Sequence, residues 1–185
     1  MIPLQFFTQY MKHPRSVGAI LPSSRQLAEQ MVASIRFEST DCIVEYGPGT
    51  GVFTEQLIQK KRNSTKLLLF ENNRGFYELL QQKYGDMDNV HIIFDSAERV
   101  AHYLNKYGVE QVDYIVSGLP FASLPKEVSE RILRETKKVL GQDGVFITFQ
   151  YTRFKQKYLH SFFTSIQVDK VLRNAPPAFV FKCIQ

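Results

Sequence analysis

From residue 41 onward the sequence alternates between short β-rich runs and stretches with helical periodicity, and this alternation restricts the fold more than any other feature. The β-rich runs are apolar at nearly every position, and they predict strands at 42–47, 66–71, 90–95, 112–118 and 144–150. Helical patterns lie between and after them, near 52–61, 73–84, 97–107, 126–140 and 153–163. Apolar strands that alternate with helices are typical of a parallel sheet covered by helices on both faces.

The C-terminal segment departs from this alternation. Two further β-rich runs, at 165–174 and 178–185, are separated by a three-residue connection. Strands joined so closely must be antiparallel, because a parallel crossover needs a dozen or more residues. The predicted fold is therefore α/β and Rossmann-like: a seven-stranded, mostly parallel sheet with an antiparallel C-terminal hairpin and helices on both faces. We expect residues 1–40 to form an N-terminal helical or lid segment packed on a core domain at 41–185.

Composition narrows the class of protein. The chain has 185 residues, 44% apolar and 22% charged, which suits one globular domain. It lacks both a run of about 18 apolar residues and the pattern of a secretion signal, so we expect a cytoplasmic protein, free or peripheral at the inner membrane surface. Cys42 and Cys183 lie in apolar runs without a Cys-x-x-Cys motif, which predicts buried thiols and no metal site.

Charge favours an anionic partner without identifying it. Lysine and arginine number 23 against 18 acidic residues, for a net charge of +5. Such an excess is compatible with nucleic acid or with an anionic lipid surface. Composition leaves this choice and the oligomeric state open.

A glycine-rich loop follows the first predicted strand and opens a helix. It has the pattern E-x-G-x-G-x-G, formed by Glu45, Gly47, Gly49 and Gly51. A phosphate-binding P-loop needs a lysine directly after its glycines, and the first lysine here is Lys60. A dinucleotide loop, G-x-G-x-x-G, would need glycine where Val52 stands. An acid before the first glycine repels a pyrophosphate and suits a ligand that carries an ammonium group.

Two further acids end the second and third predicted strands. Glu71 lies 20 residues after Gly51, where ribose hydroxyls are usually bound, and Asp95 precedes Ser96 and Ala97 at a position suited to an adenine amino group. Strand ends of a parallel sheet share one edge, so these residues predict a single crevice. A nucleoside without phosphates but with an amino-acid tail fits it, and that ligand is S-adenosylmethionine.

These motifs resemble those of class I S-adenosylmethionine-dependent methyltransferases. The resemblance covers residues 42–185 and consists of VEYGPGTG, LLFEN, IIFDSA and IVSGLPF in that order. It implies that Glu45 and the three glycines contact the methionine end, Glu71 the ribose, and Asp95, Ser96 and Ala97 the adenine, with Ser117 beside the cofactor.

The end of the fourth predicted strand is expected to face the methyl group. Its residues Gly118, Leu119, Pro120 and Phe121 resemble two groups of methyltransferases. The rRNA adenine dimethylases carry Asn-Leu-Pro-Tyr or a close variant, so their asparagine corresponds to Gly118. Bacterial phospholipid N-methyltransferases carry a similar SGLPF. We expect the Gly118 and Leu119 carbonyls to accept hydrogen bonds from an amine, Pro120 to fix the turn, and Phe121 to contact the ammonium or to close the pocket.

The N-terminal segment also resembles the phospholipid enzymes, through YMKHPRSVGAILPSSRQLA at 10–28. Candidate substrate residues there are Tyr10, His13 and Arg15, and His13 is the candidate base. A helix from Pro3 would carry an aromatic stripe that either lies in a membrane interface or covers the crevice as a lid. The rRNA enzymes carry a C-terminal helical domain, and we expect none after the last strand here.

The sequence therefore predicts an S-adenosylmethionine-dependent N-methyltransferase whose acceptor is a phospholipid amine such as phosphatidylethanolamine. An rRNA adenine N6-methyltransferase and a non-catalytic cofactor-binding protein remain as alternatives. The expected partner is a phospholipid head group or anionic membrane surface, ahead of nucleic acid.

Overall fold

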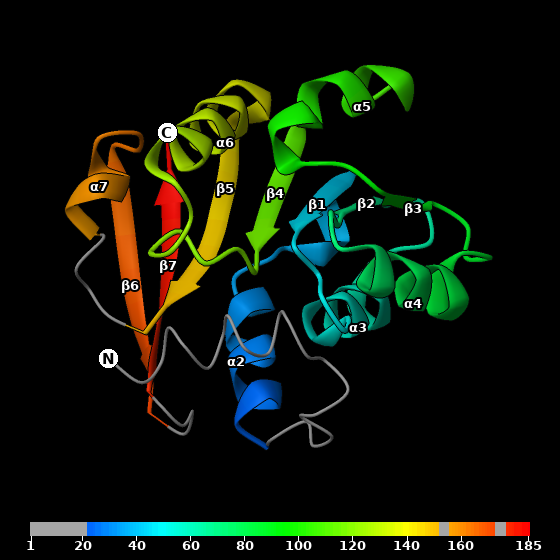
Figure 1. Ribbon diagram of the computed structural model, residues 1–185, viewed down its shortest axis with the longest axis horizontal. Coiled ribbons are helices and arrows are strands. Elements are labelled where there is room, and N and C mark those ends of the chain that lie inside the picture. The colour runs from blue at the N-terminus through cyan, green and yellow to red at the C-terminus, as the bar shows by residue number, and fades with distance from the viewer. Residues whose placement is uncertain (1–21, 152–155, 173–176) are drawn as a thin grey trace.

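The computed structural model describes residues 22–151, 156–172 and 177–185, and it contains a seven-stranded sheet. The strand order is β3-β2-β1-β4-β5-β7-β6 (Figure 1). The first five strands pair in parallel, and β7 pairs antiparallel with both β5 and β6. The strands are β1 Cys42–Tyr46, β2 Lys66–Phe70, β3 Val90–Ile93, β4 Val112–Ser117, β5 Leu140–Gln150, β6 Ser165–Val171 and β7 Ala178–Ile184. The predicted fold class is confirmed.

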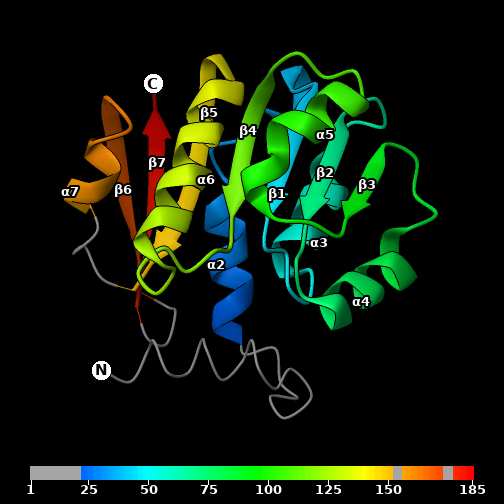
Figure 2. The same ribbon diagram turned by 45° about the horizontal axis from the view of Figure 1, so that its top comes forward.

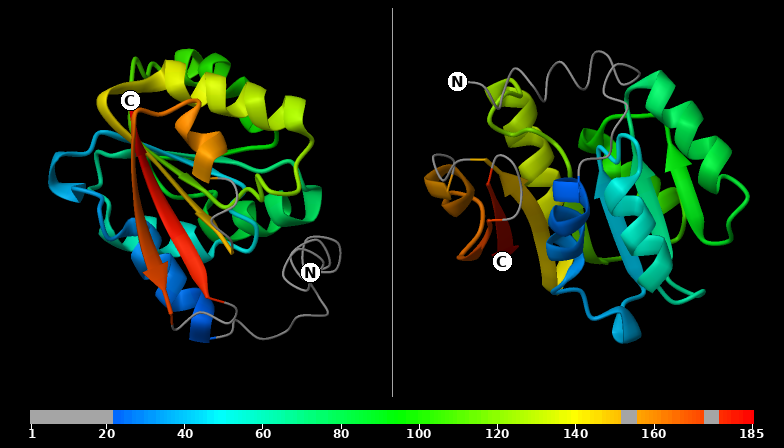
Figure 3. Two further views of the ribbon diagram at one scale, coloured as in Figure 1. Left: turned by 90° about the vertical axis from the view of Figure 1, so that its left-hand side faces the viewer. Right: turned by 90° about the horizontal axis from the view of Figure 1, so that it is seen from below.

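Helices cover both faces of the sheet, as the two views of Figure 3 show. One face packs against α2 Pro22–Val32, α3 Val52–Lys60 and α4 Arg74–Tyr84. The other packs against α5 Val100–Lys106, α6 Lys126–Val139 and α7 Gln156–His160. Two short 3₁₀ turns, η1 Phe37–Ser39 and η2 Ala97–Arg99, precede β1 and α5. The helix expected at 97–107 is thus a 3₁₀ turn followed by an α-helix.

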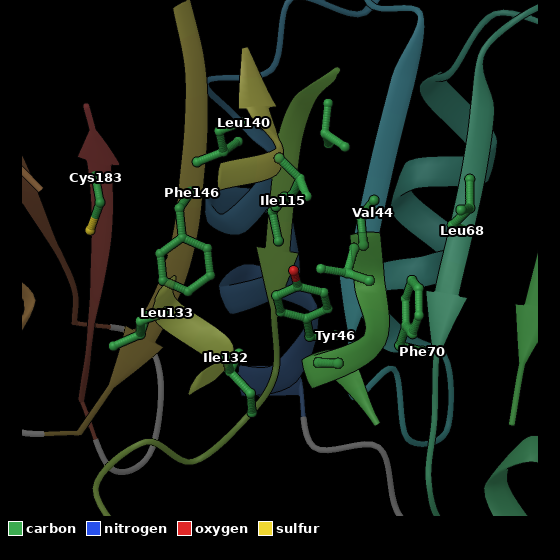
Figure 4. Close-up of a cluster of buried hydrophobic side chains, with 14 of the residues drawn as sticks. Val44, Tyr46, Leu68, Phe70, Ile115, Ile132, Leu133, Leu140, Phe146 and Cys183 are labelled. Atoms are coloured by element: carbon green, nitrogen blue, oxygen red, sulfur yellow. The ribbon is translucent and has the colours of Figure 1, made fainter. Parts of the chain in front are cut away.

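The core is divided between these two faces because side chains alternate along each strand. Val44, Tyr46, Ile115 and Phe146 point to the α5–α6–α7 side, where they meet Ile132 and Leu133 of α6 (Figure 4). Cys183 belongs to this cluster, and Cys42 is also buried; burial raises the pKa of both thiols to about 12. The cysteines are therefore packing residues, as predicted.

The junction between α6 and β5 differs from the one that the sequence predicts. β5 begins at Leu140, directly after α6 ends at Val139, four residues earlier than expected. Its pairing with β4 shifts register between Val112 and Tyr114, which accommodates the extra residues. The described part of the N-terminal segment packs on the core through α2, whose Leu27, Met31 and Val32 are buried.

Candidate active site

The predicted site residues converge at the carboxyl edge of the parallel strands, where backbone hydrogen bonds join consecutive strand ends. The Gly47 amide donates to the Phe70 carbonyl at 2.9 Å, and the Gly118 amide donates to the Tyr46 carbonyl at 2.8 Å. These bonds continue the ladder past the last paired residues of β1 and its neighbours. The glycine loop therefore lies between the end of β2 on one side and the end of β4 on the other (Figure 1).

The glycine loop depends on backbone conformations that side chains disfavour. Gly47, Gly49 and Gly51 have φ values of +62°, +58° and +89°, all in the left-handed region. Gly51 is also the N-cap of α3, so the loop leads directly into a helix N-terminus. A Cβ built on Gly49 would meet no atom of the described residues within 4 Å, although the residue is buried. Within the described part of the chain, the loop thus has space beside it in which a ligand could approach the backbone closely.

The side chain of Glu45 is buried, and one of its two carboxyl oxygens has no hydrogen-bond partner among the described residues. Its Oε2 accepts a hydrogen bond from the Thr54 hydroxyl of α3 at 2.7 Å. Its Oε1 is buried and has no hydrogen-bond partner among the described residues. Burial, reinforced by the nearby Glu71 carboxyl, raises the pKa of Glu45 to about 8. A buried carboxyl oxygen without a donor fits an ammonium group supplied by a ligand.

Glu71 holds the glycine loop in place. Its Oε2 accepts from the Gly49 amide at 3.0 Å, and its Oε1 accepts from the Asn73 amide at 2.8 Å. The side chain is 1% exposed, and burial raises its pKa while the backbone hydrogen bonds oppose that shift. Two oxygens with one donor each retain free lone pairs, so the carboxylate can still accept from a ligand hydroxyl.

Asp95, Ser96 and Ala97 form a compact turn at the end of β3. Asp95 accepts from the Ser96 amide at 2.7 Å and from the Tyr103 hydroxyl at 3.0 Å, and it pairs with Arg99 at 3.2 Å. Ser96 caps η2 by accepting from the Glu98 amide, and Ala97 is buried. Both polar side chains already have protein partners, so an adenine contact would be additional to these.

The end of β4 is packed tightly against the glycine loop. A Cβ at Gly118 would lie 2.6 Å from the Gly47 carbonyl oxygen, closer than real Cβ contacts allow. A Cβ at Gly47 would in turn lie 2.8 Å from Cδ2 of Leu119. The Ser117 side chain is buried, and its hydroxyl accepts from the Leu119 amide at 3.2 Å, so it caps the turn. Gly118 is therefore required by the backbone packing itself.

Phe121 is buried at the end of the turn that follows β4. Its side chain is 2% exposed, and its ring meets that of Phe146 edge-on at 5.9 Å. It belongs to the core cluster on the α6 side of the sheet. Whether the ring contacts an ammonium group or closes the pocket stays a prediction.

A comparison with protein families agrees with this geometry. The model for ribosomal RNA adenine dimethylases matches residues 18–159. The chain belongs to this family. The expected enzyme class is thereby confirmed: the protein is an S-adenosylmethionine-dependent N-methyltransferase.

The relatives of this adenine dimethylase family member differ in the substrate that their names state. An ornithine lipid N-methyltransferase of Singulisphaera acidiphila is 29% identical over 183 residues, which cover 96% of this chain and 93% of that protein. The ribosomal RNA small subunit methyltransferase A of Borreliella burgdorferi is 29% identical over 111 residues, or 59% of this chain. The match spans 36% of that enzyme, about a third of its length.

Among solved structures, the 1,6-didemethyltoxoflavin-N1-methyltransferase of Burkholderia thailandensis superimposes with a TM-score of 0.70. The match covers 98% of this chain and 87% of that one at 12% identity. The Burkholderia structure contains 1,6-didemethyltoxoflavin and S-adenosylhomocysteine. At so low an identity the likeness shows the fold. At the carboxyl edge of the parallel strands of this fold, the family member described here carries Glu45, the glycine loop and Glu71.

Sequence reasoning missed Thr54, the one described side chain that hydrogen-bonds Glu45. A signal for it exists, since Thr54 stands in the first turn of the helix that the glycine loop opens. Tyr10, His13 and Arg15, and the stripe expected after Pro3, lie outside the described residues.

The described residues include no helix with the length and apolar character needed to cross a membrane. They also include no group of three or more His, Cys, Asp or Glu side chains arranged to hold a metal ion.

Proposed function

We propose that this methyltransferase N-methylates the amine of a membrane lipid such as phosphatidylethanolamine. The observation that carries the proposal is the contact of Gly118 with the Gly47 carbonyl, because it leaves no room for the asparagine that the adenine dimethylases place there. An adenine amine is planar and needs an amide at that position for orientation, whereas an aliphatic lipid amine can be oriented by acceptors at other positions. The nearly full-length similarity to an ornithine lipid N-methyltransferase supports the same class of acceptor.

On the donor side, hydrogen-bond acceptors of the protein would hold the ammonium group and the ribose hydroxyls of S-adenosylmethionine. The unpartnered Oε1 of Glu45 would accept from the ammonium of the methionine end, and the free lone pairs of Glu71 would accept from the ribose. Asp95, Ser96 and Ala97 would lie at the adenine. The glycines would let the backbone approach closely, since the space beside Gly49 is open.

The cofactor supplies an activated methyl group: the amine nitrogen forms a bond to its carbon while the bond to sulfur breaks. The protein's contribution is to position and desolvate the amine, whose lone pair must first be free of its proton. The Gly118 carbonyl would accept from the amine, and so would the Leu119 carbonyl, which already accepts from the Phe121 amide at 3.0 Å. Pro120 would fix the turn that carries both carbonyls.

The test is a transfer of labelled methyl groups with the full-length protein. Acceptors are vesicles containing phosphatidylethanolamine, vesicles containing ornithine lipid, vesicles of phosphatidylglycerol alone, and small-subunit rRNA. We expect label in one or both amine lipids and none in the amine-free vesicles. Label that enters rRNA and neither lipid would overturn the proposal and favour the adenine N6-methyltransferase alternative.

Cofactor binding is measured separately, so that a missing acceptor is not mistaken for a missing donor site. Titration calorimetry with S-adenosylhomocysteine should give a binding isotherm for the wild type. No heat with this ligand or with S-adenosylmethionine would instead remove the assignments of Glu45 and Glu71. For alanine variants of Glu45 and Glu71, the matched control is Glu78→Ala, which alters an exposed acid of α4 that pairs with Arg74 on the helix surface.

A further inference from the structure

An amine aimed at a methyl group needs a hydrogen-bond acceptor, and the side chains at the end of β4 do not provide one. Gly118 has no room for a side chain, because the Gly47 carbonyl stands 2.6 Å from its Cβ position. The Ser117 hydroxyl already accepts from the Leu119 amide. The Phe121 ring is buried against Phe146. Among the described residues, β5, which pairs with β4, can supply such a side chain.

Gln150 is the last residue of β5, the strand that pairs with β4. Ser117, the last residue of β4, is opposite Thr148, whose hydroxyl lies 3.4 Å from the Ser117 carbonyl. Side chains two positions apart on a strand point to the same face, so Gln150 lies on that face one step beyond the end of β4. In Figures 1 and 2 the connection from β4 to α6 passes in front of β5.

The side chain of Gln150 is mostly buried, but its amide makes no hydrogen bond within the described residues. The residue is 6% exposed, and none of the described hydrogen bonds includes its side chain. Its amide atoms are not among the fully buried polar atoms that lack a partner, so the amide keeps some access to a ligand or to water. The residue lies at the carboxyl edge of the sheet, beside the end of β4.

We infer that Gln150 is a positioning residue for the acceptor amine: its Oε1 accepts an amine N–H, the role for which position 118 has no side chain. The inference rests on the proposed function, since it assumes an aliphatic lipid amine as acceptor. An amide at the end of a flexible side chain suits such an amine, because both groups adjust to each other. The Nε2 of the same amide is free to donate to an ester or phosphate oxygen of the lipid.

The first experiment replaces the amide while keeping its volume. Gln150→Met should lower kcat/KM for the amine lipid by about 10- to 100-fold, as expected for the loss of one hydrogen bond to a group that becomes charged. The dissociation constant of S-adenosylhomocysteine should stay within twofold. The unfolding midpoint should stay unchanged, because methionine keeps the volume of the side chain and no hydrogen bond within the described residues is lost.

Two more variants separate positioning from packing. Gln150→Glu keeps an acceptor oxygen at the same place but favours the protonated amine, so its kcat/KM should be low near pH 7 and should recover toward the wild-type value as the pH rises. Gln142→Ala changes an exposed glutamine near the start of the same strand and should change neither rate nor midpoint.

Each outcome has a distinct meaning. If the wild type methylates an amine lipid and Gln150→Met does so at the wild-type rate, Gln150 has no role and the proposed function stands. If Gln150→Met lowers the unfolding midpoint and Gln150→Glu rescues nothing, Gln150 is a packing residue and the inference fails. If the wild type methylates no lipid amine while calorimetry shows cofactor binding, the proposed function fails and takes the inference with it.

Discussion

The proposed donor and acceptor sides of the site differ in their use of charge. The donor side contains two buried carboxyl groups, Glu45 and Glu71, and burial raises the pKa of both. The acceptor side, residues 117–121, carries no ionisable side chain and is shaped by backbone contacts. Under the proposed function, charge would select the cofactor, whereas shape and neutral hydrogen bonds would select the acceptor.

The difference follows from what each side has to bind. A cofactor with an ammonium group and ribose hydroxyls brings several donors, and buried carboxylates are strong acceptors for them. An amine nucleophile must lose its proton before it reacts, and a carboxylate beside it would favour the protonated form. An uncharged acceptor side thus keeps the amine reactive.

The largest effect is expected where the two sides touch. Gly118→Asn places a Cβ against the Gly47 carbonyl, so the glycine loop and the β4 turn must separate. We expect the variant to lose cofactor binding. Methyl transfer should fall at least about 1,000-fold, because misplacing the reacting groups by about 1 Å already costs about 100-fold and the loss of cofactor binding adds to that cost. Calorimetry and the labelled-methyl assay measure both. Gly75→Asn, on the exposed start of α4, is the control. A Gly118→Asn variant that gained activity on rRNA would contradict the steric argument.

The next effect tests the donor side alone. Glu71→Ala removes the acceptor for the Gly49 and Asn73 amides as well as the ribose contact. Affinity for S-adenosylhomocysteine should fall by about 10- to 100-fold, since each charged hydrogen bond is worth about 1.5–3 kcal/mol. With saturating cofactor, KM for the lipid should stay unchanged. Unaltered cofactor affinity would remove Glu71 from the site.

A pH dependence should appear on the donor side and be absent from the acceptor side. The pKa of Glu45 is about 8 in the ligand-free protein, and an ammonium ligand favours the ionised form. Cofactor affinity should therefore rise with pH, by up to about tenfold per unit below pH 8, and level off where the ligand's own amine, with a pKa of about 7.7–8.0, loses its proton. Calorimetry from pH 6 to pH 8.5 measures this slope, and Glu45→Gln should flatten it.

The same shift makes a prediction for folding. A carboxyl group whose pKa is higher in the folded state stabilises the fold most below its unfolded value of about 4.3, and this contribution is lost as pH rises through about 8. The ligand-free protein should therefore lose roughly 3.5 kcal/mol of unfolding free energy between pH 5 and pH 8. Denaturant unfolding of wild type and Glu45→Gln checks this, because the variant should lack that loss. Equal slopes for both proteins would mean that Glu45 is ionised when buried.

The same contrast explains what the sequence could predict. Strand order and the donor side follow from local signals: apolar runs, glycine spacing, and acids such as Glu71 at strand ends, which one edge of a parallel sheet must gather. The partners of Glu45 and Gly118 required the structure, because Thr54 and the Gly47 carbonyl reach them through tertiary packing. The packing of Phe121 required the structure for the same reason. An aromatic residue after a turn suits either side of the chain, and Phe146, from another strand, decides between them.

The smallest effect on activity should come from Phe121. In the core, Phe121→Leu removes part of a buried ring and should lower the unfolding free energy by about 1–2 kcal/mol. At a temperature where the variant is fully folded, kcat/KM for the amine lipid should change less than threefold. A ring in contact with the developing ammonium would behave in the opposite way, with a loss of about 0.5–2 kcal/mol in the transition state and little change in stability. Phe94→Leu, at a half-exposed ring after β3, provides the comparison for stability and should leave it unchanged. A variant at Phe121 that is as stable as wild type but turns over tenfold more slowly would return this ring to the acceptor side.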